Sequence, residues 1–298
     1  MLPIRNQPCA RSVVHRWWSY GLACLIFVMT GGFAMGAERP SLRIGLTPII
    51  PYDRVGLIDD WHRYLEGKLG RRVEFVQRDS YRAVIDLLAH DQVDCAWVSV
   101  YPYVYVHHNY NLQLLATPVY RGQPFFRGYL IVPAEDKTTA NVLQLQGKIF
   151  AFADPYSFTG YLLPRHELFM AGKDATTFFA KTFFTKGHKR VVQAVAAGLA
   201  DGGFVDSYIW DTLAAADTRL TSRTRVVEMS GLHGFPPLVA ARKLKDGDLA
   251  QIRRVLLDMS SDPVGRELLR RMSLDGFVAG DPKWYEEAAR MMHAVGDI

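Results

Sequence analysis

The sequence has little of what marks a disulfide-stabilised protein or a nucleic-acid-binding protein. Its 298 residues contain three cysteines, and Cys9 and Cys24 fall within the first 37 residues. Only Cys95 lies beyond that point, so the rest of the chain can form no internal disulfide. Three of the 35 Lys and Arg residues also lie in the first 37 positions, which leaves 32 basic side chains against 30 acidic ones. This near balance gives no case for a nucleic-acid partner.

The N-terminal stretch has the pattern of an export signal. Basic residues end at Arg16, an apolar stretch spans residues 17–33, and small residues lead up to Ala37. We expect cleavage after Ala37 and a mature protein in the periplasm. Because the leader is long for a signal peptide, an uncleaved membrane anchor stays open as an alternative, although Gly31 and Gly32 interrupt the apolar stretch.

After the leader, short apolar runs alternate with segments of helical periodicity. Residues 42–46 and 72–77 predict strands, and between them apolar side chains recur at every fourth position over residues 57–69. Strands and helices in such alternation predict a parallel sheet with helices on both faces. Ligands bind beyond the carboxyl ends of the strands of such sheets, where we expect a loop at residues 101–103.

The alternation of strands and helices repeats in the second half of the chain. The segment 120–132 is rich in Gly and Pro and is interpreted as a crossing into a second lobe. The sequence therefore predicts an α/β protein of two lobes, each a sheet flanked by helices. The expected boundaries are residues 1–37 for the signal peptide, 38–124 with 225–298 for a discontinuous first lobe, and 125–224 for the second lobe.

The segment that follows the apolar run 148–153 is the main candidate for a binding site. An Asp-Pro pair ends the predicted strand, because proline has no N–H for a strand ladder and restricts the residue before it. Ser157, Thr159 and Gly160 come next, just before a segment of helical periodicity. Hydroxyls and free backbone N–H groups at the start of a helix can bind an anion. Ordinary capping of the helix by the same side chains is the alternative.

Six runs of residues, in this order, resemble the periplasmic substrate-binding proteins of phosphate, phosphite and phosphonate transporters. They are residues 43–48, 79–83, 92–97, 103–104, 154–164 and 187–207. The resemblance implies a two-lobed, type II-like periplasmic-binding-protein fold with the ligand in a cleft between the lobes. It also implies delivery of a small oxyanion to the membrane permease of an ABC transporter, without a cofactor. We expect the protein to be a monomer.

The resemblance implies eight ligand-binding residues. They are Tyr52, Tyr103, Ser157, Phe158, Thr159, Gly160, His188 and Asp206. Ser157 and Thr159 would donate their hydroxyls to a tetrahedral oxyanion, and Thr159 and Gly160 would donate main-chain N–H groups. Asp206 would accept a hydrogen bond from a protonated oxygen or an ammonium group of the ligand.

The remaining roles are divided between the lobes. Tyr103 would donate from the first lobe and His188 from the second, and Tyr52 would wall the mouth of the cleft. From the residues alone, His188 could equally begin a surface helix, Asp206 could cap the helix after it, and both tyrosines near 102 could be core aromatics. Because Tyr101 and Tyr103 alternate, we expect one of them to face the cleft, and we favour Tyr103.

Two departures from the family pattern bear on affinity. Phe158 stands where the family usually has a hydroxyl, and Ser99-Val100 stands where a Gly-Pro pair is common. The turn therefore offers one donor fewer and more apolar bulk. Because a lost hydrogen bond to a charged group is worth roughly 1.5–3 kcal/mol, we expect weaker binding of phosphate or phosphonate, or a different anion.

Catalysis is a further alternative, because Ser157, His188 and Asp206 are the residue types of a catalytic triad. Triads are recognised by geometry, which a sequence does not give. The Gly-x-Ser-x-Gly pattern of a nucleophile elbow is absent around Ser157. We therefore expect binding without catalysis.

Cys95 leaves a sensor role open. It lies in a strand-like run, where a buried inert thiol is the plainer interpretation. The alternative is a soft ligand for trivalent arsenic. Relatives of the family include periplasmic sensors, so this alternative implies a ligand-loaded sensor of an arsenic oxyanion that acts on a membrane histidine kinase.

Overall fold

The computed structural model describes residues 40–47, 56–110 and 112–298. The predicted signal peptide, its cleavage site and Tyr52 therefore lie outside the described residues. Within the described ranges, no helix is both long and apolar enough to span a bilayer.

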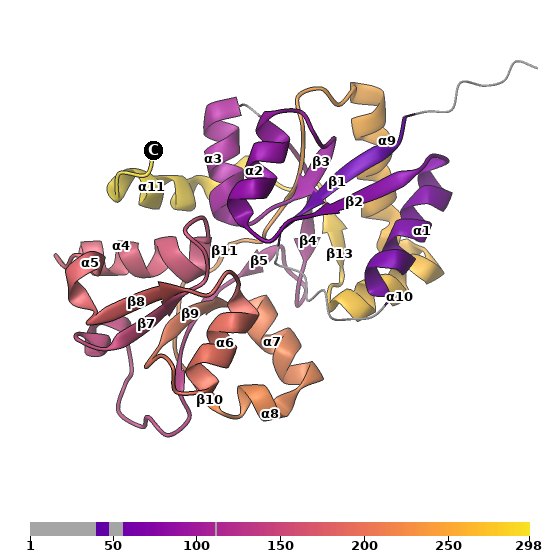
Figure 1. Ribbon diagram of the computed structural model, residues 1–298. Coiled ribbons are helices and arrows are strands. Elements are labelled where there is room, and N and C mark those ends of the chain that lie inside the picture. Colours follow the sequence, from indigo (N-terminus) through magenta and orange to yellow (C-terminus); the bar gives the residue numbers. More distant parts are fainter. Residues whose placement is uncertain (1–39, 48–55, 111) are drawn as a thin grey trace, which may run out of the picture. The chain divides into compact units, whose positions relative to one another are not determined.

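Six strands form one mixed sheet in the order β13–β4–β12–β3–β1–β2. They are β1 (Leu42–Leu46), β2 (Val73–Gln77), β3 (Cys95–Trp97), β4 (Gln113–Val119), β12 (Leu238–Ala240) and β13 (Gly276–Val278). β1 pairs in parallel with β2 and β3, as the alternation predicts, whereas β12 runs antiparallel to β3 and β4. We call this sheet and its helices the first lobe (Figure 1). The helices are α1 (Leu57–Leu69), α2 (Tyr81–Ala89), α3 (Val100–Tyr110), α9 (Asp246–Leu257) and α10 (Pro263–Met272), with the short η3 (Asp258–Ser261).

Local sequence explains where the first helices begin and end. Trp61 and Leu65 belong to the buried face of α1, and Gly70 ends the helix in the left-handed region at φ 62°. The Ser80 hydroxyl caps α2 by accepting a hydrogen bond from the Ala83 N–H at 3.3 Å. The periodicity seen in the sequence is therefore the buried face of each helix.

The prediction of a loop at residues 101–103 is wrong, because these residues lie in the first turn of α3. Pro102 suits this place, since N–H groups in the first turn have no partner within the helix. Residues two positions apart on a helix point about 200° apart. Tyr101 and Tyr103 therefore face different sides of α3.

Two smaller sheets form what we call the second lobe. β6 (Gly128–Pro133) lies between β10 (Thr224–Met229) and β9 (Gly203–Asp206) and is antiparallel to both. β7 (Ile149–Phe152) pairs in parallel with β8 (Lys181–Phe184), and a bridge from Phe150 to Gly202 joins β7 to the segment before β9. The helical elements are η1 (Val142–Leu145), η2 (Phe158–Leu162), α4 (Leu163–Met170), α5 (Ala175–Phe178), α6 (His188–Ala196), α7 (Ser207–Ala216) and α8 (Thr218–Thr221).

A short antiparallel ribbon lies where the chain passes between the lobes. It consists of β5 (Phe125–Phe126) and β11 (His233–Gly234). The crossing predicted at residues 120–132 includes β5. The pairing of β10 with β6 places residues 224–229 in a sheet of the second lobe, and the lobe boundaries given above remain predictions.

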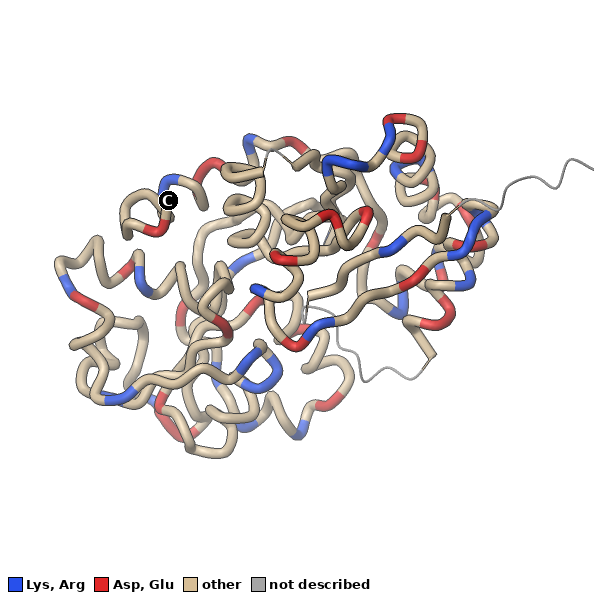
Figure 2. Tube along the Cα trace, turned by 45° about the horizontal axis from the view of Figure 1, so that its top comes forward, with Lys and Arg blue, Asp and Glu red and all other residues tan. Residues whose placement is uncertain are grey.

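The C-terminal helix touches both lobes. After η4 (Pro282–Tyr285), α11 (Glu286–Ala294) packs against α3 of the first lobe and against η2 and α4 of the second (Figure 1). Figure 2 shows Lys and Arg interspersed with Asp and Glu along the chain, in keeping with the balanced charge of the sequence.

Candidate functional site

The segment after β7 forms a tight turn held by two hydrogen bonds to Asp154, one to its side chain and one to its backbone carbonyl. The buried Asp154 carboxylate accepts a hydrogen bond from the Tyr156 N–H at 2.8 Å, and the Asp154 carbonyl accepts one from the Ser157 N–H at 2.9 Å. Burial raises the pKa of Asp154, and the hydrogen bond from Tyr156 opposes that shift. This turn directs the chain from the end of a buried strand into η2.

The first turn after Ser157 is a π-helix, a rare conformation that often marks functional sites. The Ser157 hydroxyl oxygen caps it by accepting a hydrogen bond from the Gly160 N–H at 3.1 Å. Ser157 and Thr159 are almost fully buried. A Cβ on Gly160 would lie 2.4 Å from the Ala153 Cβ and 3.2 Å from the His188 Cε1, so only glycine fits this approach. The Gly160 N–H, which we expected to bind ligand, is already donated to Ser157.

His188 begins α6 and meets the turn directly. Its Nε2 lies 3.4 Å from the Ser157 Oγ, and its Nδ1 accepts a hydrogen bond from the main-chain N–H of Asp206 at 3.3 Å. Burial lowers the pKa of His188 to about 3, so the ring is neutral near pH 7. Because a neutral imidazole carries one proton and Nδ1 is the acceptor, the proton is on Nε2 and points toward Ser157.

This arrangement leaves the Ser157 proton available. Its oxygen accepts from the Gly160 N–H and faces the Nε2–H of His188. A serine hydroxyl has one proton to donate, and neither of these partners takes it. Ser157 can therefore donate to an additional acceptor beside His188, as an oxyanion site requires.

Asp206 ends β9 at the same place. Its Oδ1 accepts a hydrogen bond from the Tyr208 N–H at 3.0 Å, so it does cap α7. Burial raises the pKa of Asp206 to about 8, although the hydrogen bonds from the α7 backbone oppose the shift. The carboxyl is therefore mostly protonated near pH 7 and can act as donor or acceptor.

The three residues are together but do not form a catalytic triad. In a triad the carboxylate accepts a hydrogen bond from the histidine Nδ1–H. Here Nδ1 of His188 is itself an acceptor, and its partner is the main-chain N–H of Asp206. This tautomer points a donor at Ser157, whereas a general base would point a lone pair.

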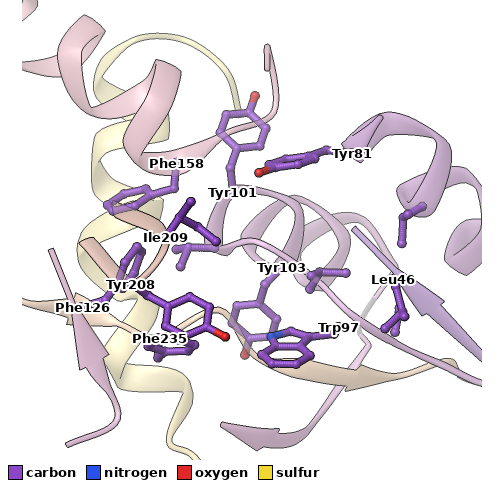
Figure 3. Close-up of a cluster of buried hydrophobic side chains, with 14 of the residues drawn as sticks. Leu46, Tyr81, Trp97, Tyr101, Tyr103, Phe126, Phe158, Tyr208, Ile209 and Phe235 are labelled. Carbon is purple, nitrogen blue, oxygen red and sulfur yellow. The ribbon is translucent and has the colours of Figure 1, made fainter. Parts of the chain in front are cut away.

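Phe158 is fully buried and leaves the turn in another direction. Its ring lies 4.7 Å from the ring of His233 and 6.2 Å from that of Phe126, which come from the two strands of the crossing ribbon. Figure 3 shows Phe158 in a cluster of buried aromatic side chains. Phe158 therefore packs the turn against the connection between the lobes.

The structure does not bring Tyr103 to the turn. Its ring packs on Tyr285 at 4.5 Å and on His107 at 5.6 Å, and it lines a cavity of about 410 Å³ beside Arg253 and Gly280. Among the described residues, its ring contacts do not reach Ser157 or His188. Tyr101 and Tyr103 point in opposite directions in Figure 3, as expected for their spacing on a helix.

Tyr101 meets the turn instead, and the sequence analysis missed its partner. The Tyr101 ring lies 5.6 Å from that of Tyr156, edge to face. Tyr156 stands directly before Ser157 in the Asp-Pro turn. This position beside a predicted ligand residue was the one signal in the sequence that pointed to Tyr156.

The sequence model of a family described as "ABC transporter, phosphonate, periplasmic substrate-binding protein" matches residues 44–285. The chain belongs to this family. It is 28% identical over 151 residues to the phosphate-import protein PhnD of Mycolicibacterium smegmatis, a match that covers 48% of this chain and 47% of that protein. It is 24% identical over 251 residues to the phosphonates-binding periplasmic protein of Escherichia coli, covering 82% of this chain and 74% of that one.

Solved structures share the fold of this phosphonate-binding family member. A binding protein component of an ABC phosphonate transporter from Pseudomonas aeruginosa has a TM-score of 0.78 at 19% identity and covers 85% of each chain. PhnD1 of Prochlorococcus marinus, in complex with methylphosphonate, has a TM-score of 0.78 at 18% identity and covers 87% of this chain and 99% of the other. The two-lobed fold implied by the resemblance is therefore confirmed.

Cys95 of this family member is fully buried in β3, and burial raises the pKa of its thiol. A thiol must ionise to bind a soft metal or metalloid ion tightly. The family match and the relatives give no support to the sensor alternative.

Proposed function

We propose that this protein binds a small phosphorus oxyanion of the phosphonate, phosphite or phosphate class between its two lobes. The observation that carries the proposal is the tautomer of His188, which the Asp206 N–H fixes so that the ring presents a donor beside the free hydroxyl proton of Ser157. The Thr159 hydroxyl and the N–H groups at the start of η2 would complete a set of neutral donors.

Dry surroundings would make these donors effective. Hydrogen bonds from buried neutral donors to an oxyanion are charge-assisted and about twice as strong as neutral ones. Asp206 would accept a hydrogen bond from a P–OH group of the anion, or would ionise beside an ammonium group in an aminoalkylphosphonate. Contacts from both lobes would favour the closed cleft, whose shape a permease recognises.

The relatives support a role in transport across the membrane. The family is periplasmic, and the P. aeruginosa and P. marinus proteins are a transporter component and a methylphosphonate complex. In the proposal, residues 1–37 export this chain, and the closed form delivers its anion to an ABC permease in the membrane. The protein would act by binding alone, as a monomer, with no turnover of phosphoesters.

Isothermal titration with methylphosphonate, phosphite, phosphate and sulfate tests the site. We expect Thr159→Val to weaken binding of the preferred anion about tenfold or more, because it removes a hydroxyl from a buried charged acceptor. Thr182→Val, at an exposed position on β8, is the matched control and should leave affinity unchanged. Equal affinity in wild type and Thr159→Val would refute the assignment of the turn.

A further inference from the structure

The anion turn carries a side chain that reaches the other lobe. Tyr156 precedes Ser157 directly, and its N–H is bound to the Asp154 carboxylate at 2.8 Å. The backbone of Tyr156 is therefore fixed in the second lobe, whereas its ring and hydroxyl contact residues of the first lobe. A movement of the first lobe away from the turn would break these contacts.

Three side chains of the first lobe surround Tyr156. The Arg82 Nη1 donates a hydrogen bond to the Tyr156 hydroxyl at 3.1 Å, and the guanidinium carbon lies 5.8 Å from the centre of the ring. The rings of Tyr101 and Tyr105 meet the Tyr156 ring edge to face, at 5.6 and 6.3 Å. Arg82 is oriented by Asp86 on the same helix, at 2.9 Å. α2 and α3 thus form an aromatic and cationic receptor for this ring.

Tyr101 also takes part in a second contact between the lobes. Burial raises the pKa of the Tyr101 hydroxyl, and the nearby charge of the Asp297 carboxylate raises it further. Both oxygens of Asp297 accept from the Arg165 Nη1 in α4, at 2.9 and 3.1 Å. The Arg165 guanidinium lies 4.7 Å from the centre of the Tyr161 ring. Tyr101 therefore lies between the ring of Tyr156 and the ion pair of Asp297 with Arg165.

We propose that Tyr156 is a positioning residue that docks the anion turn onto α2 and α3 and so closes the cleft before a ligand arrives. The expected effect of Tyr156 on anion affinity rests on the proposed function, whereas its role in closing the lobes does not. The contacts of Tyr156 use no ligand atom, so they favour the closed form whatever the anion is. Apparent affinity rises with the fraction of molecules already in the binding-competent form, and losing the contact should weaken every ligand by the same factor.

The size of this factor follows from the contacts. An aromatic pair or a partly exposed cation–π contact shifts an equilibrium by about two- to tenfold. Two ring pairs and one cation contact act together at Tyr156, and part of the surface is exposed. We expect Tyr156→Ala to weaken the binding of methylphosphonate and of phosphate by the same factor, about tenfold. Thr159→Val should change the ratio between anions, because it removes a donor that they use unequally.

The test measures closure without ligand. Spin labels on Arg254→Cys of α9 and Gln193→Cys of α6, both exposed positions, report the separation of the lobes by double electron–electron resonance. Cys95 is buried and should not react with the label, and the labelled protein begins at Glu38, so it lacks Cys9 and Cys24. We expect wild type to contain a closed population in the absence of anion, which Tyr156→Ala and Arg82→Gln deplete. Tyr156→Phe keeps the ring contacts and should restore most of it. Arg78→Gln is the matched control, because Arg78 is exposed and, among the described residues, its hydrogen bond goes to the neighbouring Gln77 carbonyl rather than to the second lobe.

The proposal is wrong if wild type and Tyr156→Ala have the same distribution of spin-label distances without ligand. It is also wrong if Tyr156→Ala binds one anion as well as wild type does and another anion more weakly. Thermal unfolding of each variant identifies any loss of fold, and Tyr156→Phe keeps the test informative if the alanine variant does not fold. If no anion binds to wild type, the proposed function fails, whereas the distance measurement still tests the role of Tyr156.

Discussion

At the scale of single residues, burial holds the two titratable groups beside the turn in their neutral forms. It lowers the pKa of His188 to about 3 and raises that of Asp206 to about 8. Near pH 7 the site therefore contains a neutral imidazole donor and a protonated carboxyl. These forms suit an anion, because no Asp206 charge repels it and the neutral His188 ring still offers an N–H donor.

The state of Asp206 makes stability depend on pH. Its folded pKa of about 8 lies above the ordinary aspartate pKa of 3.8, so the folded state keeps a proton that the unfolded state releases between these values. Stability from this group is full below about pH 4 and is lost as pH rises toward 8, by at most about 1.4 kcal/mol per pH unit. Asparagine can keep the cap of α7 and cannot ionise. We expect Asp206→Asn to gain free energy of unfolding relative to wild type as pH rises from 5 to 8.

Denaturant titrations at a series of pH values measure this difference. Asp174→Asn is the control, because Asp174 is an exposed cap of α5 whose pKa is lowered by its hydrogen bonds to Thr176. Its difference from wild type should not rise with pH in this window. A difference between Asp206→Asn and wild type that stays flat from pH 5 to pH 8 would show that Asp206 is ionised in the folded protein.

At the scale of elements, the π-helical turn depends on one close approach. The Cα of Gly160 packs against Ala153 at the end of β7 and near His188 at the start of α6. Three elements therefore meet where a side chain would not fit. This contact brings Ser157 within 3.4 Å of the histidine ring.

We expect Gly160→Ala to lower the free energy of unfolding by about 1–3 kcal/mol and to weaken anion binding, because the new methyl group must displace Ala153 or the turn. Gly67→Ala is a matched control within α1, where an added Cβ meets nothing within 4 Å and φ is not positive. That change should stabilise the protein by up to about 1 kcal/mol, since alanine favours helix. Chemical denaturation compares the two variants, and equal effects would contradict the packing argument.

The sequence predicted the positions of helices and strands better than it predicted contacts between residues far apart in the chain. Apolar periodicity located α1 and α2, and the Asp-Pro pair located the end of β7, because these features depend on neighbouring residues. The family resemblance brought Ser157 and His188 to one site. It also favoured Tyr103, whose ring packs on Tyr285, whereas the Tyr101 ring meets Tyr156 beside the turn. The contact of Tyr156 with Arg82 joins residues 74 positions apart, and no local pattern encodes it.

At the scale of the whole molecule, the lobes are joined by more than the crossing ribbon. α11 packs against helices of both lobes, and Asp297, which follows this helix, is bonded to Arg165 of the second lobe. An anion held between the lobes would add to these contacts. Anion binding should therefore stabilise both lobes against unfolding, and we expect the two lobes to unfold together.

We expect methylphosphonate or the preferred phosphorus oxyanion to raise the midpoint of thermal unfolding. At a free concentration one hundred times Kd, the gain is about 2.7 kcal/mol, which corresponds to roughly 5–10 °C for a chain of this size. Scanning calorimetry of wild type with increasing anion measures the shift, and Thr159→Val should need a higher concentration for the same shift. A midpoint that no phosphorus oxyanion moves would speak against the proposed ligand class.

The uncharged character of the donors around Ser157 has one more consequence. Among the described residues, the hydrogen-bond partners of Ser157, His188 and Asp206 are all neutral groups. Ionic strength acts mainly on exposed charges and much less on buried dipoles. The affinity of the proposed site for its anion should therefore change little as the salt concentration rises.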